Sequence, residues 1–158
     1  MLNNKINGQR LWDSLMEMAK IGATPKGGVC RLALTDIDRD ARDLFVRWCE
    51  EAGCTISIDK MGNIFARRKG QDDSLPPVVI GSHIDSQPTG GKFDGIYGVL
   101  AGFEVLQTIN DNDITNLHPI ELVVWTNEEG CRFDCAMMGS AVWSGEMALS
   151  HAYNLKAF

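Results

Sequence analysis

Apolar side chains recur every three or four residues in several parts of the chain, and this spacing predicts amphipathic helices. The stretches with this spacing are residues 5–21, 35–52, 94–109 and the chain from residue 139 onward. The second stretch opens with Thr35-x-x-Asp38, a pattern typical of helix N-termini. Gly53 follows it at the position where a glycine commonly ends a helix.

Four other stretches predict strands. "CTISID" and "NIFARR" (54–59 and 63–68) read as two short strands joined through Met61 and Gly62. "PVVIGS" and "IELVVWT" (77–82 and 120–126) are continuous apolar runs, which are typical of strands buried on both faces of a sheet. The order helix-helix-strand-strand-strand-helix-strand-helix predicts an α/β fold, with a layered sheet flanked by helices.

Composition narrows the class of protein. A chain of 158 residues with 44% apolar and 23% charged residues suits one globular domain. The net charge of −6 gives no electrostatic surface for nucleic acid. No run approaches the ~18 apolar residues of a membrane span, and the first residues lack a signal core. The five cysteines have no spacing typical of a zinc site, so we expect reduced thiols and a cytoplasmic location.

Polar residues follow both apolar runs. His83 and Asp85 come after the first run, Glu128 and Glu129 come after the second, and Asp94 stands at the start of a predicted helix. Sites in α/β sheets collect beyond the carboxyl ends of the strands. We therefore expect these five side chains to converge at one end of the sheet.

One imidazole among several carboxylates suits divalent zinc, manganese, cobalt or nickel, because the carboxylates repel one another unless a cation lies among them. Two metal ions about 3.5–4 Å apart need a bridging ligand. We expect Asp94 to bridge, His83 to bind one ion and Glu129 the other. Asp85 is expected to accept the second ring N–H of His83, and Glu128 to serve as general base.

Each of these residues also has a simpler interpretation. A lone histidine, a Glu-Glu pair or a Gly-Gly pair in a loop is more often an ordinary turn feature. "TGGKF" lacks the glycine that a phosphate loop needs at Ser86 and the hydroxyl it needs at Phe93. At ~3.3 Å per residue, His118 should lie roughly 20 Å from Glu129, at the opposite end of its strand. His151 is expected on the surface.

Three blocks carry a resemblance to a known family. "GSHIDSQPTGGKFDGIYGVLAG", "ELVVWTNEEGCRF" and "MMGSAVWSG", with "MGNIFARRKG" upstream, resemble binuclear-metal amidohydrolases. This family includes N-carbamoyl-L-amino acid hydrolases, β-ureidopropionases and allantoate amidohydrolases, within the wider group of aminoacylase- and carboxypeptidase-like metallohydrolases. The resemblance extends over about residues 7–145.

The resemblance implies a metal-dependent amidohydrolase that acts on C–N bonds other than peptide bonds. Its expected reaction converts an N-carbamoyl-L-amino acid or ureidopropionate to the amino acid, CO2 and ammonia, and an allantoate amidohydrolase is the alternative. It implies two divalent metal ions, held by His83, Asp94 and Glu129, with Glu128 as general base and Asp85 beside them. A small carbamoyl or ureido substrate is expected, with no nucleic acid or membrane partner and with a homodimer for the complete enzyme.

The resemblance also implies that residues 1–158 are the amino-terminal part of the metal-binding catalytic domain. Family members carry two further histidine ligands and a dimerisation domain that this chain lacks. His83, Asp94 and Glu129 give each ion only two protein ligands, so we expect the isolated chain to bind metal weakly and to be inactive. A non-catalytic fragment or interaction module is the other interpretation.

Overall fold

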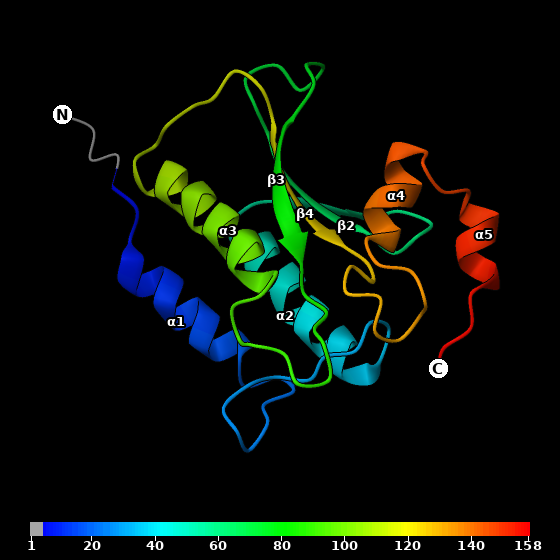
Figure 1. Cartoon of the computed structure of the whole chain (residues 1–158). Helices are drawn as coiled ribbons and strands as arrows, with labels where there is room; N and C mark the ends of the chain where they lie inside the picture. The colour runs from blue at the N-terminus through cyan, green and yellow to red at the C-terminus, as the bar shows by residue number, and fades with distance from the viewer. Residues whose placement is uncertain (1–4) are drawn as a thin grey trace.

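The computed structural model describes residues 5–158 and confirms the α/β fold, with a sheet flanked by helices (Figure 1). The elements, in chain order, are α1 (Gly8–Met18), α2 (Asp36–Glu51), β1 (Thr55–Ile58), β2 (Ile64–Arg68), β3 (Val78–His83), α3 (Ile96–Asp111), β4 (Ile120–Trp125), α4 (Met138–Ser144) and α5 (Leu149–Asn154). Within the described residues, no helix combines the length and apolarity that crossing a bilayer requires.

The four strands form one sheet in the order β1-β2-β4-β3. β2 is antiparallel to both of its neighbours, whereas β3 and β4 run parallel, with His83 opposite Trp125. Parallel neighbours leave a sheet at the same edge. The segments that follow β3 and β4 are therefore adjacent, as the sequence predicted.

Helices cover both faces of the sheet. α1, α2 and α3 bury one face in a single apolar cluster that includes Phe45, Leu100 and Leu122. On the other face Trp125 lies against Trp143 of α4, with ring centroids 5.5 Å apart. Figure 1 shows α1 and α3 on one side of the strands and α4 and α5 on the other. This packing holds the ends of β3 and β4 on a rigid frame.

The prediction that β3 is buried on both faces is wrong. Val78 is 55% exposed and Val79 is 42% exposed. Within residues 5–158 the strand lies at the edge of the sheet, paired only with β4. The apolar run predicts a strand, because its side chains favour β-structure, but it does not predict where that strand lies in the sheet.

Helix ends differ in detail from the sequence prediction. Thr35 caps α2 by accepting from the Asp38 N–H, as predicted, but the Asp38 carboxylate accepts from the Leu34 N–H at 2.9 Å rather than from Thr35. The predicted carboxyl-terminal helix is divided into α4 and α5. The division lies at Gly145, whose positive φ ends α4.

A buried ion pair joins α1 to α3. Glu104 is 1% exposed, and its carboxylate accepts from Arg10 Nε at 2.7 Å and Arg10 Nη2 at 2.8 Å. The Asn7 N–H and the Thr108 hydroxyl add two further hydrogen bonds, at 2.8 and 3.0 Å. Burial alone would raise the pKa of Glu104, but the hydrogen bonds from Arg10, Asn7 and Thr108 outweigh it and hold the pKa below its ordinary value of 4.5.

Arg10→Met should therefore lower the free energy of unfolding by about 2–3 kcal/mol at pH 7, because it leaves a buried carboxylate without its cation. A lowered pKa stabilises the fold above the unfolded-state value, and this stabilisation is lost as the pH falls through and below 4.5. Urea unfolding between pH 3 and 7 measures both effects. Arg39→Met, which breaks only exposed pairs with Asp36 and Asp40, should change little. Equal losses in the two variants would contradict the prediction.

Candidate metal centre

His83 is the last residue of β3, and its ring is buried. Its Nδ1 lies 2.9 Å from the main-chain carbonyl oxygen of Asp85. A carbonyl oxygen can only accept a hydrogen bond, so Nδ1 carries a proton, and in the neutral ring Nε2 is the nitrogen with the lone pair. The ring therefore presents Nε2 to the space beyond the strand end, where Glu128 lies.

Asp85 differs from the sequence expectation. Its carboxylate lies 3.8 Å from His83 Nδ1, too far for a hydrogen bond, and the main-chain carbonyl accepts the ring N–H instead. The carboxylate accepts the N–H groups of Glu128 at 3.3 Å and Glu129 at 3.2 Å. Burial raises the pKa of Asp85 to about 6, against the opposing effect of these two N–H groups and of His83. Asp85 thus ties the loop after β4 to the segment after β3.

The buried Arg31 fixes the segment after β3 through hydrogen bonds. Its Nε donates to the carbonyl of Ile84 at 3.0 Å. Its main-chain N–H donates to the Ser86 hydroxyl at 2.9 Å, and the Ser86 N–H donates back to the Arg31 carbonyl at 2.8 Å. Residues 83–86 therefore have a fixed path on which His83 and Asp85 are displayed.

Asp94 approaches His83 through a tight turn. The Ile96 N–H donates to the Asp94 carbonyl at 2.7 Å across Gly95, whose φ of 66° and ψ of −58° form a γ-turn that residues with side chains rarely adopt. A Cβ on Gly95 would lie 2.3–2.4 Å from three atoms of the His83 ring. Only glycine allows the chain to pass this close beneath the imidazole.

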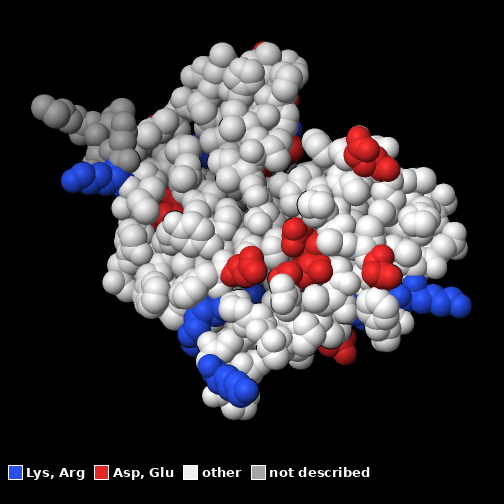
Figure 2. Space-filling view, in the orientation of Figure 1, with Lys and Arg blue, Asp and Glu red and all other residues white. Residues whose placement is uncertain are grey.

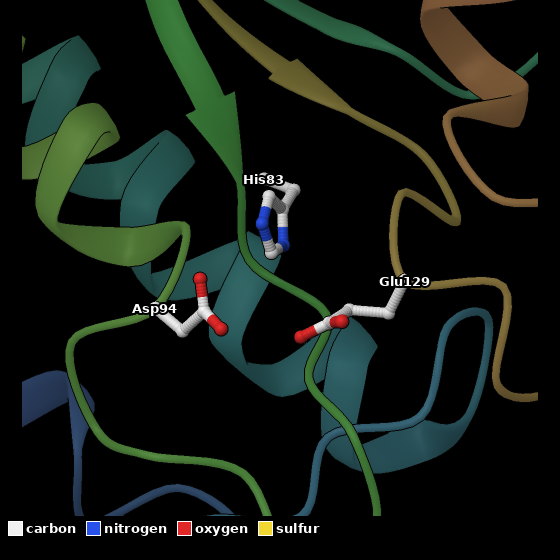
Figure 3. A group of neighbouring side chains, drawn as sticks. All are labelled: His83, Asp94 and Glu129. Atoms are coloured by element: carbon white, nitrogen blue, oxygen red, sulfur yellow. The ribbon is translucent and has the colours of Figure 1, made fainter.

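His83, Asp94 and Glu129 come together. One potential ligand atom from each lies within 4.8 Å of the others. Figure 3 shows His83 at the end of β3, Asp94 before α3 and Glu129 after β4, with the three side chains pointing into one space. Figure 2 shows the molecule in the orientation of Figure 1. Acidic side chains gather near the middle of the face in view, over the region where β3 and β4 end.

Two observations show that a cation fits this space. Nε2 of His83 lies 3.2 Å from Oε2 of Glu128, so an imidazole nitrogen and a carboxylate oxygen, both atom types that bind divalent cations, face the same space. Oε1 of Glu129 is buried and has no hydrogen-bond partner. Imidazole nitrogen together with carboxylate oxygens is a donor set that divalent zinc and its first-row neighbours accept.

Two supporting residues were missed by the sequence analysis. Gln87 Nε2 donates to Glu129 Oε2 at 3.1 Å. Asn63, fully buried, accepts the Thr126 N–H at 2.9 Å and donates to the Gly139 carbonyl at 3.0 Å, which fixes the start of the loop that carries Glu128 and Glu129. Asn63 stands inside the quoted block "MGNIFARRKG", so the resemblance offered a signal for it. Gln87 stands in another quoted block, but no spacing rule singles it out.

The remaining histidines lie elsewhere. His118 stands just before β4, and its Nδ1 lies 2.8 Å from the Pro76 carbonyl oxygen, at the opposite end of the strand from Glu129. His151 is exposed on α5. Among the described residues, neither belongs to the group formed by His83, Asp94 and Glu129.

Comparison with known proteins relates this chain to amidohydrolases. The N-carbamoyl-L-amino-acid amidohydrolase of Rhizobium meliloti is 54% identical over 154 residues, which cover 98% of this chain and 37% of that protein. The N-carbamoyl-L-amino acid amidohydrolase of Geobacillus stearothermophilus is 45% identical over 142 residues, covering 90% and 35%. A hydantoinase/carbamoylase family amidase from Burkholderia vietnamiensis superposes with a TM-score of 0.97 at 59% identity, over 99% of this chain and 38% of that one.

The chain thus spans little more than a third of the length of these relatives. A family model described as peptidase family M20/M25/M40 matches residues 79–158, which carry all five candidate site residues. Enzymes of family M20 depend on metal ions, in agreement with the donor set at the ends of β3 and β4. The chain belongs to peptidase family M20/M25/M40.

Proposed function

We propose that this chain provides the catalytic carboxylates and part of the metal site of an amidohydrolase that cleaves N-carbamoyl-L-amino acids to the amino acid, CO2 and ammonia. The convergence of His83, Asp94 and Glu129 within 4.8 Å, beside Glu128, carries the proposal. The amidohydrolases of Rhizobium meliloti and Geobacillus stearothermophilus support this choice of substrate, because both are named for it.

Two divalent ions, zinc or else manganese, cobalt or nickel, would be held here. His83 would bind one ion through Nε2, Glu129 would bind the other, and Asp94 would contribute an oxygen to each. When bound, such ions polarise a carbonyl group and make a nearby water molecule more acidic. The buried, unpartnered Oε1 of Glu129 supports its part in this set.

Glu128 is proposed as the general base. Its main-chain N–H is held by Asp85 at 3.3 Å, and its own carboxylate oxygen lies 3.2 Å from His83 Nε2, so it stands at the proposed metal site. From there it can accept a proton from the attacking water and pass it to the leaving nitrogen of the carbamoyl group. Asp85 acts beside it by fixing the loop that carries Glu128 and Glu129.

Residues 1–158 are proposed to be the amino-terminal part of a catalytic domain. The curated relatives are nearly three times as long as the aligned region, since that region covers 37% and 35% of their lengths. Further metal ligands, substrate-binding groups and a dimer interface would come from the rest of such a protein. The 158-residue chain alone would then bind metal more weakly than the complete enzyme and would not turn over substrate.

Asp94→Ala tests the metal site. Removing the proposed bridging carboxylate should weaken binding of both ions by more than the roughly 10–100-fold that a lost supporting contact costs. Equilibrium dialysis of the 158-residue chain against zinc or manganese, with metal analysis, measures the loss. In the full-length protein, ammonia release from an N-carbamoyl-L-amino acid should disappear as well.

Asp40→Ala, a change of the same kind at an exposed position on α2, is the matched control and should bind metal as the unaltered chain does. Unchanged stoichiometry and affinity in Asp94→Ala would refute the proposed site.

Carbamoyl-α-amino acids, ureidopropionate and allantoate, assayed side by side on the full-length protein, test the choice of substrate.

A further inference from the structure

We propose that Gln87 is a positioning residue that orients the carboxylate of Glu129 so that its buried oxygen faces the metal site. The inference rests on the proposed function, because it gives Gln87 a role in metal binding by Glu129. Gln87 itself would not touch metal or substrate.

The two oxygens of Glu129 have different surroundings. Oε2 accepts a hydrogen bond from Gln87 Nε2 at 3.1 Å. Oε1 is buried and lacks any hydrogen-bond partner, although it belongs to a carboxylate within 4.8 Å of potential ligand atoms of His83 and Asp94. With Oε2 held from one side, rotation of the carboxylate is restricted and Oε1 is the oxygen left to bind a cation.

Gln87 is itself held at its main chain. Its carbonyl oxygen accepts from the Gly90 N–H at 3.1 Å and from the Ser86 hydroxyl at 3.0 Å. Ser86 is in turn paired with the main chain of Arg31. The side chain of Gln87 therefore extends from a fixed turn after β3 across to the loop after β4.

Asp85 and Gln87 act on different parts of Glu129. The Asp85 carboxylate accepts the Glu129 main-chain N–H at 3.2 Å and so fixes the backbone. The glutamate side chain still has three rotatable bonds, and Gln87 restrains its far end. A neutral amide suits this position, because it donates a hydrogen bond without adding a positive charge that would repel a divalent cation.

Gln87→Met tests the inference, because it keeps the length of the side chain and removes the N–H donor. Cobalt titration of the 158-residue chain, followed by visible absorption, should give a dissociation constant about tenfold higher than that of the unaltered chain and an altered cobalt spectrum. The thermal midpoint of the metal-free chain should stay the same, since Gln87 is exposed and buries no apolar surface that the change removes.

Gln9→Met is the matched control. Gln9 also donates from Nε2 to a carboxylate, that of Asp13 at 2.8 Å, but on the exposed surface of α1. It should bind cobalt like the unaltered chain. Gln87→Met with the same affinity and spectrum as Gln9→Met would overturn the inference and leave the proposed function standing. If the unaltered 158-residue chain binds no cobalt, the same titration is made on the full-length protein, where absence of cobalt binding would overturn both.

Discussion

Glu128→Gln is expected to lower the turnover of an N-carbamoyl-L-amino acid by roughly 10²–10⁴-fold in the full-length protein, with metal binding retained. Glutamine has nearly the same shape as glutamate but cannot take up a proton at neutral pH. The main-chain N–H of residue 128 would still donate to Asp85, so the loop should keep its path. Ammonia release measures turnover, and metal analysis after dialysis measures occupancy.

The separation of these two quantities identifies the role of Glu128. If Glu128 were a metal ligand, both turnover and occupancy would fall together. Glu50→Gln makes the same change at an exposed position near the end of α2, beside the start of β1 and far from the ends of β3 and β4, and should leave both quantities unchanged. Near-normal turnover in Glu128→Gln would show that another group moves the proton.

Gly95→Ala is expected to abolish metal binding at the proposed site, and with it activity, although no proposed ligand is changed. The new Cβ would lie 2.3–2.4 Å from the His83 ring, so the ring or the turn must move. A residue with a side chain at φ 66° also costs about 1–3 kcal/mol of stability. Both effects separate His83 from Asp94. Zinc titration and thermal unfolding of the 158-residue chain measure the two losses.

Gly91→Ala is the matched control for Gly95→Ala. It lies four residues earlier in the same segment, and a Cβ there would meet no atom within 4 Å. It should bind zinc and unfold like the unaltered chain. Equal zinc affinity in the two variants would mean that the close approach of Gly95 to the imidazole does not matter for the site.

The gathering of the candidate site residues was predictable, because it depends on chain order and strand direction. The apolar runs before His83 and before Glu128 marked two strands, and their parallel pairing brings both ends to one edge of the sheet. Helices α2 and α3 were visible in the 3.6-residue period and in the Thr35 cap. These signals are local in sequence, so a single chain is enough to read them.

Other features depend on contacts between distant segments and were not predictable. The exposure of Val78 follows from the place of β3 at the edge of the sheet, which the composition of the strand does not encode. The start of α3 at Ile96 rather than at Asp94 follows from the γ-turn at Gly95 beneath His83. The contact of Gln87 with Glu129 joins residues 42 positions apart and has no pattern in sequence.

The acceptor of the His83 ring N–H is a carbonyl of the main chain, not a side chain. Evolution can therefore replace the residue at position 85 without altering which nitrogen of the imidazole is available, provided that the chain keeps its path. A substitution scan at this position would report on how well the two loops are joined rather than on imidazole chemistry. The path of the backbone determines which ring nitrogen of His83 carries the hydrogen-bonded proton. Only changes that bend residues 83–86 would alter that hydrogen bond.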